Sequence, residues 1–224
     1  MIITIDGPAG AGKSTVARAL ARRLGFRYLD TGAMYRAVAL VGMRRGVDWD
    51  RPEQLAQLAQ TLDIKLIGEK IFLDGEDVTE AVRSSAVTAV TRHAADNPQV
   101  RRHLVGLQRA AAGNDDMVTE GRDQGTVAFP RAECKIFLTA GAEERARRRL
   151  RDLQNQGEAA TLEEVLAAQQ LRDRRDRTRG VGRLVAAADA REVCTDGMTV
   201  EEVVDRLEAL VREMERAQKG PADG

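Results

Sequence analysis

The stretch DGPAGAGKST, residues 6–15, constrains the fold of this chain more than any other part of it. An apolar run, MIITI, precedes the stretch, and a helical pattern, VARALARRL, follows it. Gly7, Gly12, Lys13 and Ser14 fit G-x-x-x-x-G-K-[ST] between a strand and a helix, which is the context of a P-loop. In such a loop backbone N–H groups converge on phosphate oxygens, the lysine reaches the β- and γ-phosphates, and the serine hydroxyl can ligate Mg²⁺. The sequence therefore predicts a site for a nucleotide polyphosphate.

The spacing of the glycines separates this loop from another nucleotide-binding pattern. A dinucleotide fold requires G-x-G-x-x-G, whereas Gly7, Gly10 and Gly12 have the reverse spacing. A P-loop alone does not separate a kinase from a nucleotide-dependent switch. Guanine-nucleotide switches carry Asn-Lys-x-Asp and Asp-x-x-Gly, and this sequence contains neither an Asn-Lys pair nor an Asp followed three residues later by Gly. A switch is thus the weaker hypothesis. A motor or helicase should have acidic metal ligands at the end of an apolar strand, and Glu120 is the only residue that comes near this pattern.

Short apolar runs recur along the chain, and each ends in a polar residue, a glycine or a small residue. They cover residues 2–6, 27–30, 117–121, 135–140 and 192–196. Helical patterns separate most of them, which predicts βα units and a parallel sheet. Asp30 ends the second run and is expected to cap the following turn. Thr199 as N-cap and Glu202 as its capping-box partner predict a final helix, so both ends of the chain are expected in one α/β core.

Two segments interrupt the βα pattern. The stretch LDIKLIGEKIFLDGEDVT predicts short strands with turns at Gly68-Glu69 and Asp74-Gly75, and a helical stretch follows it. A second interruption contains the glycine-bearing loop NQGEAAT. We expect a core at 1–36, 109–150 and 171–224, the last with the C-terminal helix, a monophosphate-binding insertion at 37–108, and a lid at 151–170.

Charge composition limits the partners of the chain. The formal net charge is zero with 31% charged residues, so no global field attracts nucleic acid or an anionic membrane. The cations are mostly Arg, since Lys occurs only at positions 13, 65, 70, 135 and 219. Arg suits bidentate binding of phosphate and carboxylate groups, although genomic base composition would produce the same bias.

The two cysteines and the apolar segments bear on the compartment. Cys134 and Cys194 both lie in apolar runs, which favours buried thiols over a disulfide or a metal ligand. The first apolar run is too short for a signal-peptide core, and no stretch approaches the ~20 apolar residues of a membrane span. We expect a cytoplasmic protein without a membrane partner.

Three groups of arginines are candidates for binding a second phosphate. Arg36 and Arg122 each lie just past a predicted strand end, where open parallel sheets bind ligands. The third group is Arg172, Arg174, Arg175, Arg177 and Arg179. Within it Arg172, Asp176 and Arg179 have spacings of four and three, which predicts one helix face, with a salt-bridged solvated face as the alternative. An RNA-binding patch is disfavoured because only four Phe, one Trp and two Tyr occur in the chain.

Five segments together resemble the bacterial cytidylate kinases, a family that transfers the γ-phosphate of ATP to CMP or dCMP. They are IDGPAGAGKST, LDTGAMYRA, EGRDQGTVAFPRAECKIFLTA, ERARRRL and RDRRDRTR, and the likeness runs from residue 2 to about 212. The D-[ST]-G-A-x-Y-R and G-R-D-x-G-T-x-x-F-P motifs are far more specific than the P-loop. The resemblance implies an α/β fold with a P-loop NTPase-type core, a five-stranded parallel sheet, an inserted monophosphate-binding domain and a lid.

The resemblance also implies roles for residues on the acceptor side. The residues expected to bind CMP are Thr31, Arg36, Thr91, Arg101, Arg122, Asp123, Arg172, Asp176 and Arg179. Arg36, Arg122 and Arg179 would hold the acceptor phosphate. Cytosine would meet Asp123, Arg101 and a hydroxyl group, and the ribose would lie against Arg172 and Asp176. The segment TRHAADNP is one residue longer than the usual spacing, so Thr91 is the best match for the hydroxyl, and Gln124 replaces a common apolar residue.

On the donor side the resemblance places ATP on the P-loop, with Mg²⁺ on Ser14. The residues concerned are Gly7, Pro8, Ala9, Gly10, Ala11, Gly12, Lys13, Ser14 and Thr15. Arg145 and Arg149 are candidates for contact with the transferring group, and the catalytic set is Lys13, Arg122, Arg179, Arg145 and Arg149. Direct in-line transfer needs no covalent intermediate.

The expected partners are CMP, dCMP and ATP, without nucleic acid, and the expected state is a monomer. The alternative is another small-acceptor P-loop kinase, acting on a different nucleoside monophosphate or on shikimate. The shikimate hypothesis does not explain why the chain carries Asp123 and Arg101, a pair that suits cytosine.

Overall fold

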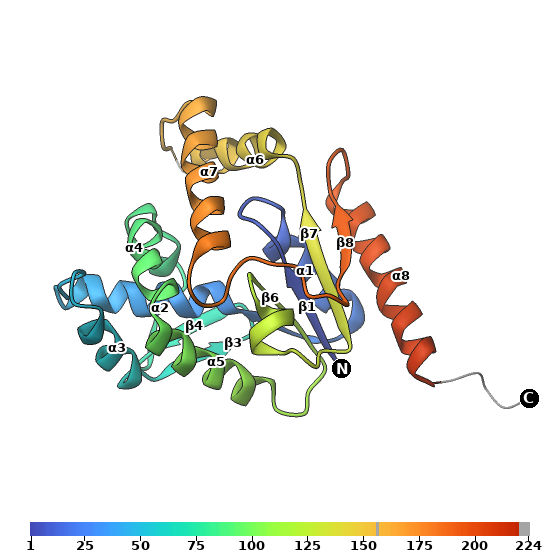
Figure 1. The fold of residues 1–224 in the computed structure, drawn as a ribbon, viewed down its shortest axis with the longest axis horizontal. Helices are drawn as coiled ribbons and strands as arrows, with labels where there is room; N and C mark the ends of the chain where they lie inside the picture. The colour runs from blue at the N-terminus through green and yellow to red at the C-terminus, as the bar shows by residue number, and fades with distance from the viewer. Residues whose placement is uncertain (156, 220–224) are drawn as a thin grey trace, which may run out of the picture. The chain divides into compact units, whose positions relative to one another are not determined.

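The computed structural model describes residues 1–155 and 157–219 and divides into two compact units. The core unit comprises Met1–Phe26 and Asp116–Gly224, and the insert unit comprises Arg27–Asp115. Figure 1 shows the course of the chain through their helices and strands. The functional domain bounds expected from the sequence remain a prediction beside this geometric division.

A five-stranded sheet contains all five apolar runs predicted from the sequence. Its strands are β1 (Ile2–Asp6), β2 (Arg27–Asp30), β6 (Met117–Gly121), β7 (Cys134–Thr139) and β8 (Arg191–Cys194), in the order β2-β6-β1-β7-β8. β1 pairs in parallel with β6 and β7, and β7 pairs in parallel with β8. The predicted α/β fold with a five-stranded parallel sheet is therefore confirmed. In the register of β1 and β6, Asp6 lies opposite Gly121, so these two strands end at the same edge.

Four α-helices and a short π-helical turn complete the core unit. They are α1 (Lys13–Leu24), η2 (Gln124–Ala128), α6 (Ala142–Asn155), α7 (Leu162–Thr178) and α8 (Val200–Lys219). Val16 and Leu20 of α1 and Leu207 of α8 are buried in the core. The capping box at the start of α8 is confirmed, because the Thr199 amide donates to the Glu202 carboxylate and the Glu202 amide donates to Thr199 Oγ1.

The insert unit combines helices with a second, antiparallel sheet. Its helices are α2 (Thr31–Arg44), α3 (Pro52–Gln60), η1 (Ala81–Arg83), α4 (Ser85–Ala95) and α5 (Pro98–Ala112), and its strands are β3 (Ile64–Ile67), β4 (Lys70–Leu73) and β5 (Glu76–Asp77). The predicted turns at Gly68-Glu69 and Asp74-Gly75 are confirmed, since they lie between consecutive strands. The apolar faces of α2, α3 and α5 share one core, with Val38, Leu55 and Leu104 in its interior.

The helical stretch predicted after these strands is interrupted at Asn97. The side chain of Asn97 accepts hydrogen bonds from the amides of Gln99 and Val100, and Pro98 occupies the first position of α5. An N-cap asparagine followed by proline starts a new helix, because proline lacks the N–H that would continue the previous one. The stretch therefore forms two helices, α4 and α5.

The start of α2 has the cap expected from the sequence. Asp30 ends β2, and its Oδ1 accepts a hydrogen bond from the Ala33 amide at 2.9 Å. This contact satisfies one of the amides that an α-helix leaves unpaired in its first turn. The predicted capping role of Asp30 is confirmed.

The two cysteines have different environments, which corrects one expectation. Both are free thiols, but Cys134 is buried whereas Cys194 is exposed. Burial raises the pKa of the Cys134 thiol to about 12, which keeps it in the neutral form. Cys194 is the last residue of β8, in which Val193 is buried, and because consecutive side chains of a strand point to opposite faces, Cys194 points away from the core.

Across residues 1–155 and 157–219, no helix is both long enough and apolar enough to pass through a membrane.

Candidate active site

The P-loop connects β1 to α1 along a path that requires glycine at two points. A Cβ atom on Gly7 would lie 2.0 Å from the carbonyl oxygen of Leu138, so no side chain fits there. Gly12 forms the N-cap of α1 with a φ of 86°, in the left-handed region that favours glycine. The residues of the predicted motif therefore fold as a loop that leads directly into a helix N-terminus, which is the part of a helix that attracts anions.

Lys13 is a buried cation at the first position of α1. Its side chain is 5% exposed, and its Nζ donates a hydrogen bond to the carbonyl oxygen of Pro8 at 2.8 Å. Burial first, and then the positive charges of Arg122 and Arg172, lower the pKa of Lys13 to about 7 against the opposing effect of Glu120 and Asp6. An anionic ligand beside this ammonium would relieve both the burial and the repulsion.

Ser14 and Glu120 form the polar pair that suits a magnesium ion. Ser14 Oγ donates to Glu120 Oε1 at 2.7 Å, and Glu120 is buried near the carboxyl end of β6. Mg²⁺ in nucleotide sites keeps several waters and takes one or two protein oxygens beside the phosphates. One hydroxyl with a carboxylate behind it fits this requirement. No group of three or more His, Cys, Asp or Glu residues that could hold a metal by itself occurs within the described parts of the chain.

The turn after β6 carries the next candidates, Arg122 and Asp123. Arg122 Nε donates to Asp176 Oδ2 at 2.8 Å, and Asp123 is buried. Gln124, the departure from the family pattern, accepts a hydrogen bond from Thr119 Oγ1 at 3.0 Å and is 2% exposed. That side-chain contact joins the start of η2 to β6.

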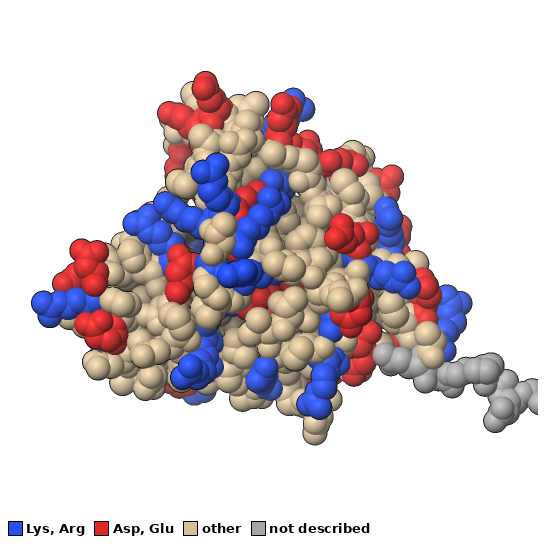
Figure 2. Space-filling model, in the orientation of Figure 1, with Lys and Arg blue, Asp and Glu red and all other residues tan. Residues whose placement is uncertain are grey.

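Asp176 on α7 joins the guanidinium groups of the acceptor-side candidates. Besides Arg122, it has Arg179 Nη1 at 3.6 Å from its Oδ1. Burial alone would raise the pKa of Asp176, but Arg122, Arg172 and Arg179 hold it below its usual value. In Figure 2 Lys and Arg side chains gather around α7. Three guanidinium groups around one carboxylate leave a net positive cluster that suits a phosphate or a ribose phosphate.

The end of α7 places Arg179 beside Asp176, as the spacing predicts. The helix ends at Thr178, but the Arg179 amide still donates to the Arg175 carbonyl at 3.0 Å, as in a helix. The Nε of Arg179 donates to the carbonyl oxygen of Gly182, which lies in the segment after the helix. Arg179 is therefore held both by its position at the end of α7 and by the chain that follows it.

The two arginines predicted to contact the transferring group differ in their surroundings. Arg145 is buried, and it donates from Nε to the Ala140 carbonyl at 3.0 Å and from Nη1 to the Ala9 carbonyl of the P-loop at 2.9 Å. Its Nη2 lies 2.7 Å from Asp173 Oδ2 of α7. Arg149, one turn along α6, is half-buried and makes no hydrogen bond or ion pair with the residues that the structure describes.

The remaining CMP-binding candidates belong to the insert unit. Arg36 Nη2 lies 3.4 Å from Asp30 Oδ2, and Thr31 is buried at the start of α2. Thr91 Oγ1 donates to the Val87 carbonyl at 2.7 Å, which leaves the hydroxyl oxygen able to accept. Arg101 is buried, donates to the Ala95 carbonyl at 3.0 Å, and has its guanidinium carbon 5.3 Å from the centre of the Tyr35 ring.

Residues that the sequence did not single out complete the site. Asp6 and Asp173 are buried carboxylates, of which Asp6 accepts from the amides of Gln124 and Gly125 and Asp173 pairs with Arg145, and Arg148 donates to the Thr195 hydroxyl and carbonyl at 3.0 and 2.9 Å. One pattern indicates Asp6, which is an acidic residue at the end of an apolar strand, directly before the glycine-rich loop. Asp173 and Arg148 lie in the segments RDRRDRTR and ERARRRL, but these charged helical runs do not show which of their side chains are buried.

Comparison with known proteins identifies relatives over nearly the whole chain. The family model described as cytidylate kinase matches residues 3–213. The cytidylate kinase of Rhodopirellula baltica is 52% identical over 217 residues, which cover 97% of this chain and 95% of that protein. The cytidylate kinase of Geobacter sulfurreducens is 44% identical over 224 residues, which cover 98% of this chain and 96% of that protein.

Among solved structures, a shikimate kinase from Bacteroides thetaiotaomicron has a similar fold. The TM-score is 0.50 at 15% sequence identity, with 95% of this chain and 98% of that chain covered. At that identity the similarity concerns the fold alone.

Proposed function

This chain belongs to the cytidylate kinase family, and we propose that it transfers the γ-phosphate of ATP to CMP and dCMP. The observation that carries the proposal is the group of cations around Lys13. Arg122 and Arg172 both lower the pKa of this buried ammonium, so all three charges lie close enough to repel one another. Such an arrangement is costly without a ligand and becomes favourable when polyphosphate and monophosphate anions occupy it.

The donor is held by the P-loop residues Gly7 to Thr15. Backbone amides of the loop and the N-terminus of α1 bind the phosphate oxygens, and Lys13 moves its ammonium from the Pro8 carbonyl to the β- and γ-phosphates. Mg²⁺ held on Ser14 supplies charge compensation across these phosphates when it is bound. Arg145, which hydrogen-bonds to the Ala9 carbonyl, fixes the loop, and together with Arg149 it is our candidate for contact with the transferring group.

The acceptor phosphate is held by Arg36, Arg122 and Arg179, and the ribose contacts Arg172 and Asp176. Thr31 contributes a hydroxyl at the start of α2. Phosphoryl transfer requires the acceptor oxygen in line with the leaving oxygen and positive charge at the equatorial oxygens. Arg122 is suited to both tasks, because its guanidinium is fixed by two contacts, from Nε to Asp176 at 2.8 Å and from Nη1 to the Gly121 carbonyl at 3.3 Å.

Asp123, Arg101 and Thr91 select cytosine by hydrogen bonding to the base. Cytosine presents an amino donor at N4 and acceptors at N3 and O2, so a carboxylate accepts from the first and an arginine donates to the others. Uracil presents an acceptor at O4, which would face the carboxylate. The Asp123–Arg101 pair gives the cytidine nucleotides the advantage over shikimate and over other monophosphates.

Three further properties belong to this proposal. We expect the protein to require Mg²⁺, to act as a monomer, and to work in the cytoplasm. The segment 151–170 serves as a lid and residues 37–108 as the monophosphate-binding domain. Lid closure would keep water from competing with CMP for the phosphoryl group.

An ADP-release assay across several acceptors tests the function directly. The purified protein, with ATP and Mg²⁺, is supplied in turn with CMP, dCMP, UMP, AMP, GMP and shikimate, and the rates are compared at equal acceptor concentration. CMP and dCMP are expected to give the highest kcat/KM, with UMP lower by about 30- to 1,000-fold, since the mismatch costs roughly 2–4 kcal/mol. A higher rate with shikimate or a purine monophosphate would establish the alternative kinase instead.

A further inference from the structure

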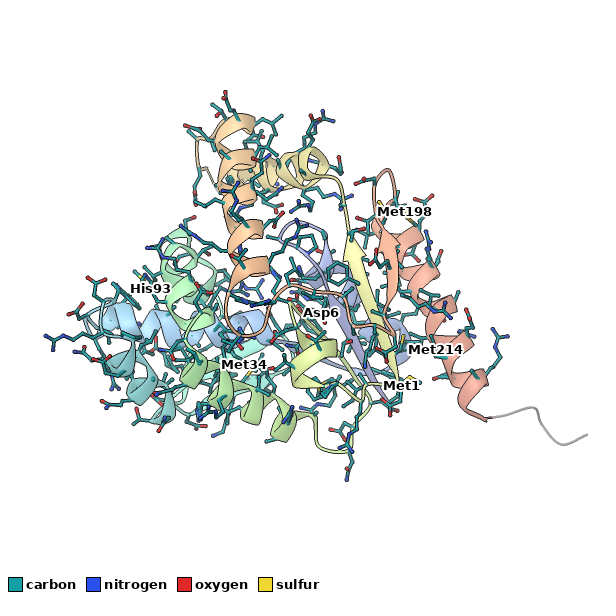
Figure 3. All side chains as sticks on the ribbon, in the orientation of Figure 1. Met1, Asp6, Met34, His93, Met198 and Met214 are labelled. Atoms are coloured by element: carbon teal, nitrogen blue, oxygen red, sulfur yellow. The ribbon has the colours of Figure 1, made fainter. Side chains whose placement is uncertain are left out.

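Asp6 occupies a junction that none of the roles assigned above explains. It is the last residue of β1, directly before the P-loop, and it is 4% exposed. Its Oδ1 accepts a hydrogen bond from the Gln124 amide and its Oδ2 accepts one from the Gly125 amide, each at 2.8 Å. Figure 3 labels Asp6 in the interior of the core unit. Both oxygens of one carboxylate are therefore used to hold two consecutive amides of the turn after β6.

The turn that Asp6 holds is the one that carries Arg122 and Asp123. β1 and β6 end side by side, with Asp6 opposite Gly121, so the carboxylate spans from one strand end to the chain leaving the other. Two hydrogen bonds to adjacent amides fix both the position and the rotation of that chain segment. Any change at Asp6 would thus be transmitted to the two side chains immediately before the bonded amides.

The charge of Asp6 is also unusual for its position. Burial, with a smaller effect of the Asp123 carboxylate, raises the pKa of Asp6 to about 6 against the opposing effect of the Gly125 and Gln124 amides and the Lys13 ammonium. Lys13 and Asp123 are thus the charged groups that face Asp6. A buried carboxylate that titrates near neutrality is costly to keep where a neutral residue could pack, unless its acceptor geometry is required.

We propose that Asp6 is a positioning residue that aligns the Arg122–Asp123 turn with the P-loop, so that one carboxylate sets both the phosphate contact and the reading of the acceptor base. The proposal rests on the proposed cytidylate kinase function. Asp6 touches neither substrate in this role. It acts through the amides of Gln124 and Gly125, and in this way it sets the orientation of Asp123 toward cytosine.

The variant Asp6→Asn tests the role with little change in shape. An amide keeps one acceptor oxygen but presents an N–H₂ group to the second backbone N–H, so one of the two bonds is lost and the turn must shift. We expect the CMP-to-UMP ratio of kcat/KM to fall by about tenfold or more and the KM for CMP to rise, while the KM for ATP stays within about threefold. Asp6→Glu, which restores the charge one methylene further out, is expected to recover part of the ratio.

A matched control is available in the insert unit. Asp74 Oδ1 accepts the Asp63 amide at 2.9 Å in an exposed turn, and its φ of 50° suits asparagine. Asp74→Asn makes the same chemical change to the same kind of hydrogen bond, and it should leave the ratio and both KM values unchanged. An Asp6→Asn protein with a lowered melting temperature but an unchanged CMP-to-UMP ratio would overturn the proposal and leave Asp6 a purely structural residue.

A pH measurement on the unmodified protein gives a second test that needs no variant. CMP and UMP share the same phosphate ionisation, so their kcat/KM ratio cancels it. As the pH falls from about 7.5 to 5.5, protonation of Asp6 removes an acceptor, and the ratio should fall by about threefold or more. A ratio constant over this range would contradict the proposal. If the protein fails to phosphorylate CMP at pH 7.5, the proposed function is wrong instead.

Discussion

The two units hold their candidate site residues in different ways. In the core unit the contacts join residues far apart in the chain, since Ser14 and Glu120 are separated by 106 positions and Asp6 and Gln124 by 118. In the insert unit the hydrogen bonds of Thr91 and Arg101 are local, although the Arg101 guanidinium also lies over the ring of Tyr35 on α2. Thr91 bonds to a carbonyl four positions away, and Arg101 bonds to one six positions away.

Under the proposed function, we expect this difference to separate the positioning of phosphates from the recognition of the acceptor. Long-range contacts form only when the parallel sheet is complete, so the core residues are aligned together and a change in one is felt by the others. A local hydrogen bond such as that of Thr91 within α4 depends mainly on the helix that carries it. We therefore expect core substitutions to lower kcat and insert substitutions to act mainly on the KM for CMP.

The largest effect is expected for Lys13→Ala. A positioned charge on the transferring phosphate is worth several kcal/mol, so turnover should fall by about a thousandfold or more with the fold intact. Steady-state kinetics with CMP and ATP measure the loss, and circular dichroism verifies folding. Lys65→Ala, which removes an exposed lysine paired with Asp63 at 2.6 Å, is the control and should keep full activity. More than a tenth of the normal turnover in Lys13→Ala would contradict the P-loop assignment.

Asp123→Ala is expected to have the next largest effect, and on specificity more than on turnover. Without the carboxylate the amino group of cytosine loses its acceptor, so the CMP advantage of about 30- to 1,000-fold over UMP should collapse. The collapse should come from lost CMP activity and not from gained UMP activity. Parallel kcat/KM measurements with the two acceptors decide the matter, and a variant that retains the full preference would remove Asp123 from base recognition.

Arg179→Ala should reduce kcat by about 10- to 100-fold and raise the KM for CMP as well. Arg179 lies beside Asp176 at the end of α7, and we expect its contact with the acceptor phosphate to tighten as the segment 151–170 closes. An unchanged kcat with a raised KM would assign Arg179 to ground-state binding. Arg177→Ala, an exposed arginine on the same helix, is the control and should change neither constant by more than about twofold.

The sequence predicted the elements of this fold well because each had a local signal. The apolar runs became β1, β2, β6, β7 and β8 with bounds within two residues, and the caps at Asp30 and Thr199 formed as expected. Apolar patterning and capping chemistry act over a few neighbouring residues, so they can be recognised in the amino-acid sequence itself.

The contacts between elements could not be predicted from the sequence, because they join residues that are far apart along the chain. Nothing near Asp6 indicates the amides of Gln124 and Gly125, which come to it only through the pairing of β1 with β6. The helical spacing that grouped Arg172 with Arg179 did not predict the end of α7 at Thr178. The identities of the candidate residues were thus predictable, whereas the partners that fix their geometry required the tertiary structure.

The smallest expected effect concerns Thr91, and it sharpens the comparison between the two units. Thr91 Oγ1 already donates to the Val87 carbonyl, so toward cytosine it can only accept, most simply from the amino group at N4. Thr91→Val keeps the shape and removes this acceptor, which should raise the KM for CMP by about three- to tenfold and leave kcat within about twofold, because one neutral hydrogen bond contributes about 1 kcal/mol.

Thr88→Val is a closely matched control for this test. Thr88 lies on the same helix, its Oγ1 donates to the Ser84 carbonyl at 3.0 Å in the same i to i−4 pattern, and it is half-buried like Thr91. Both variants therefore lose the same local bond and gain the same β-branched residue, and any difference in KM between them reports the ligand contact alone. A raised KM in Thr88→Val with an unchanged KM in Thr91→Val would move the hydroxyl contact one turn toward the start of α4. A fall in kcat in Thr91→Val would show instead that the insert unit takes part in aligning the phosphates, and the separation of roles between the two units would be wrong.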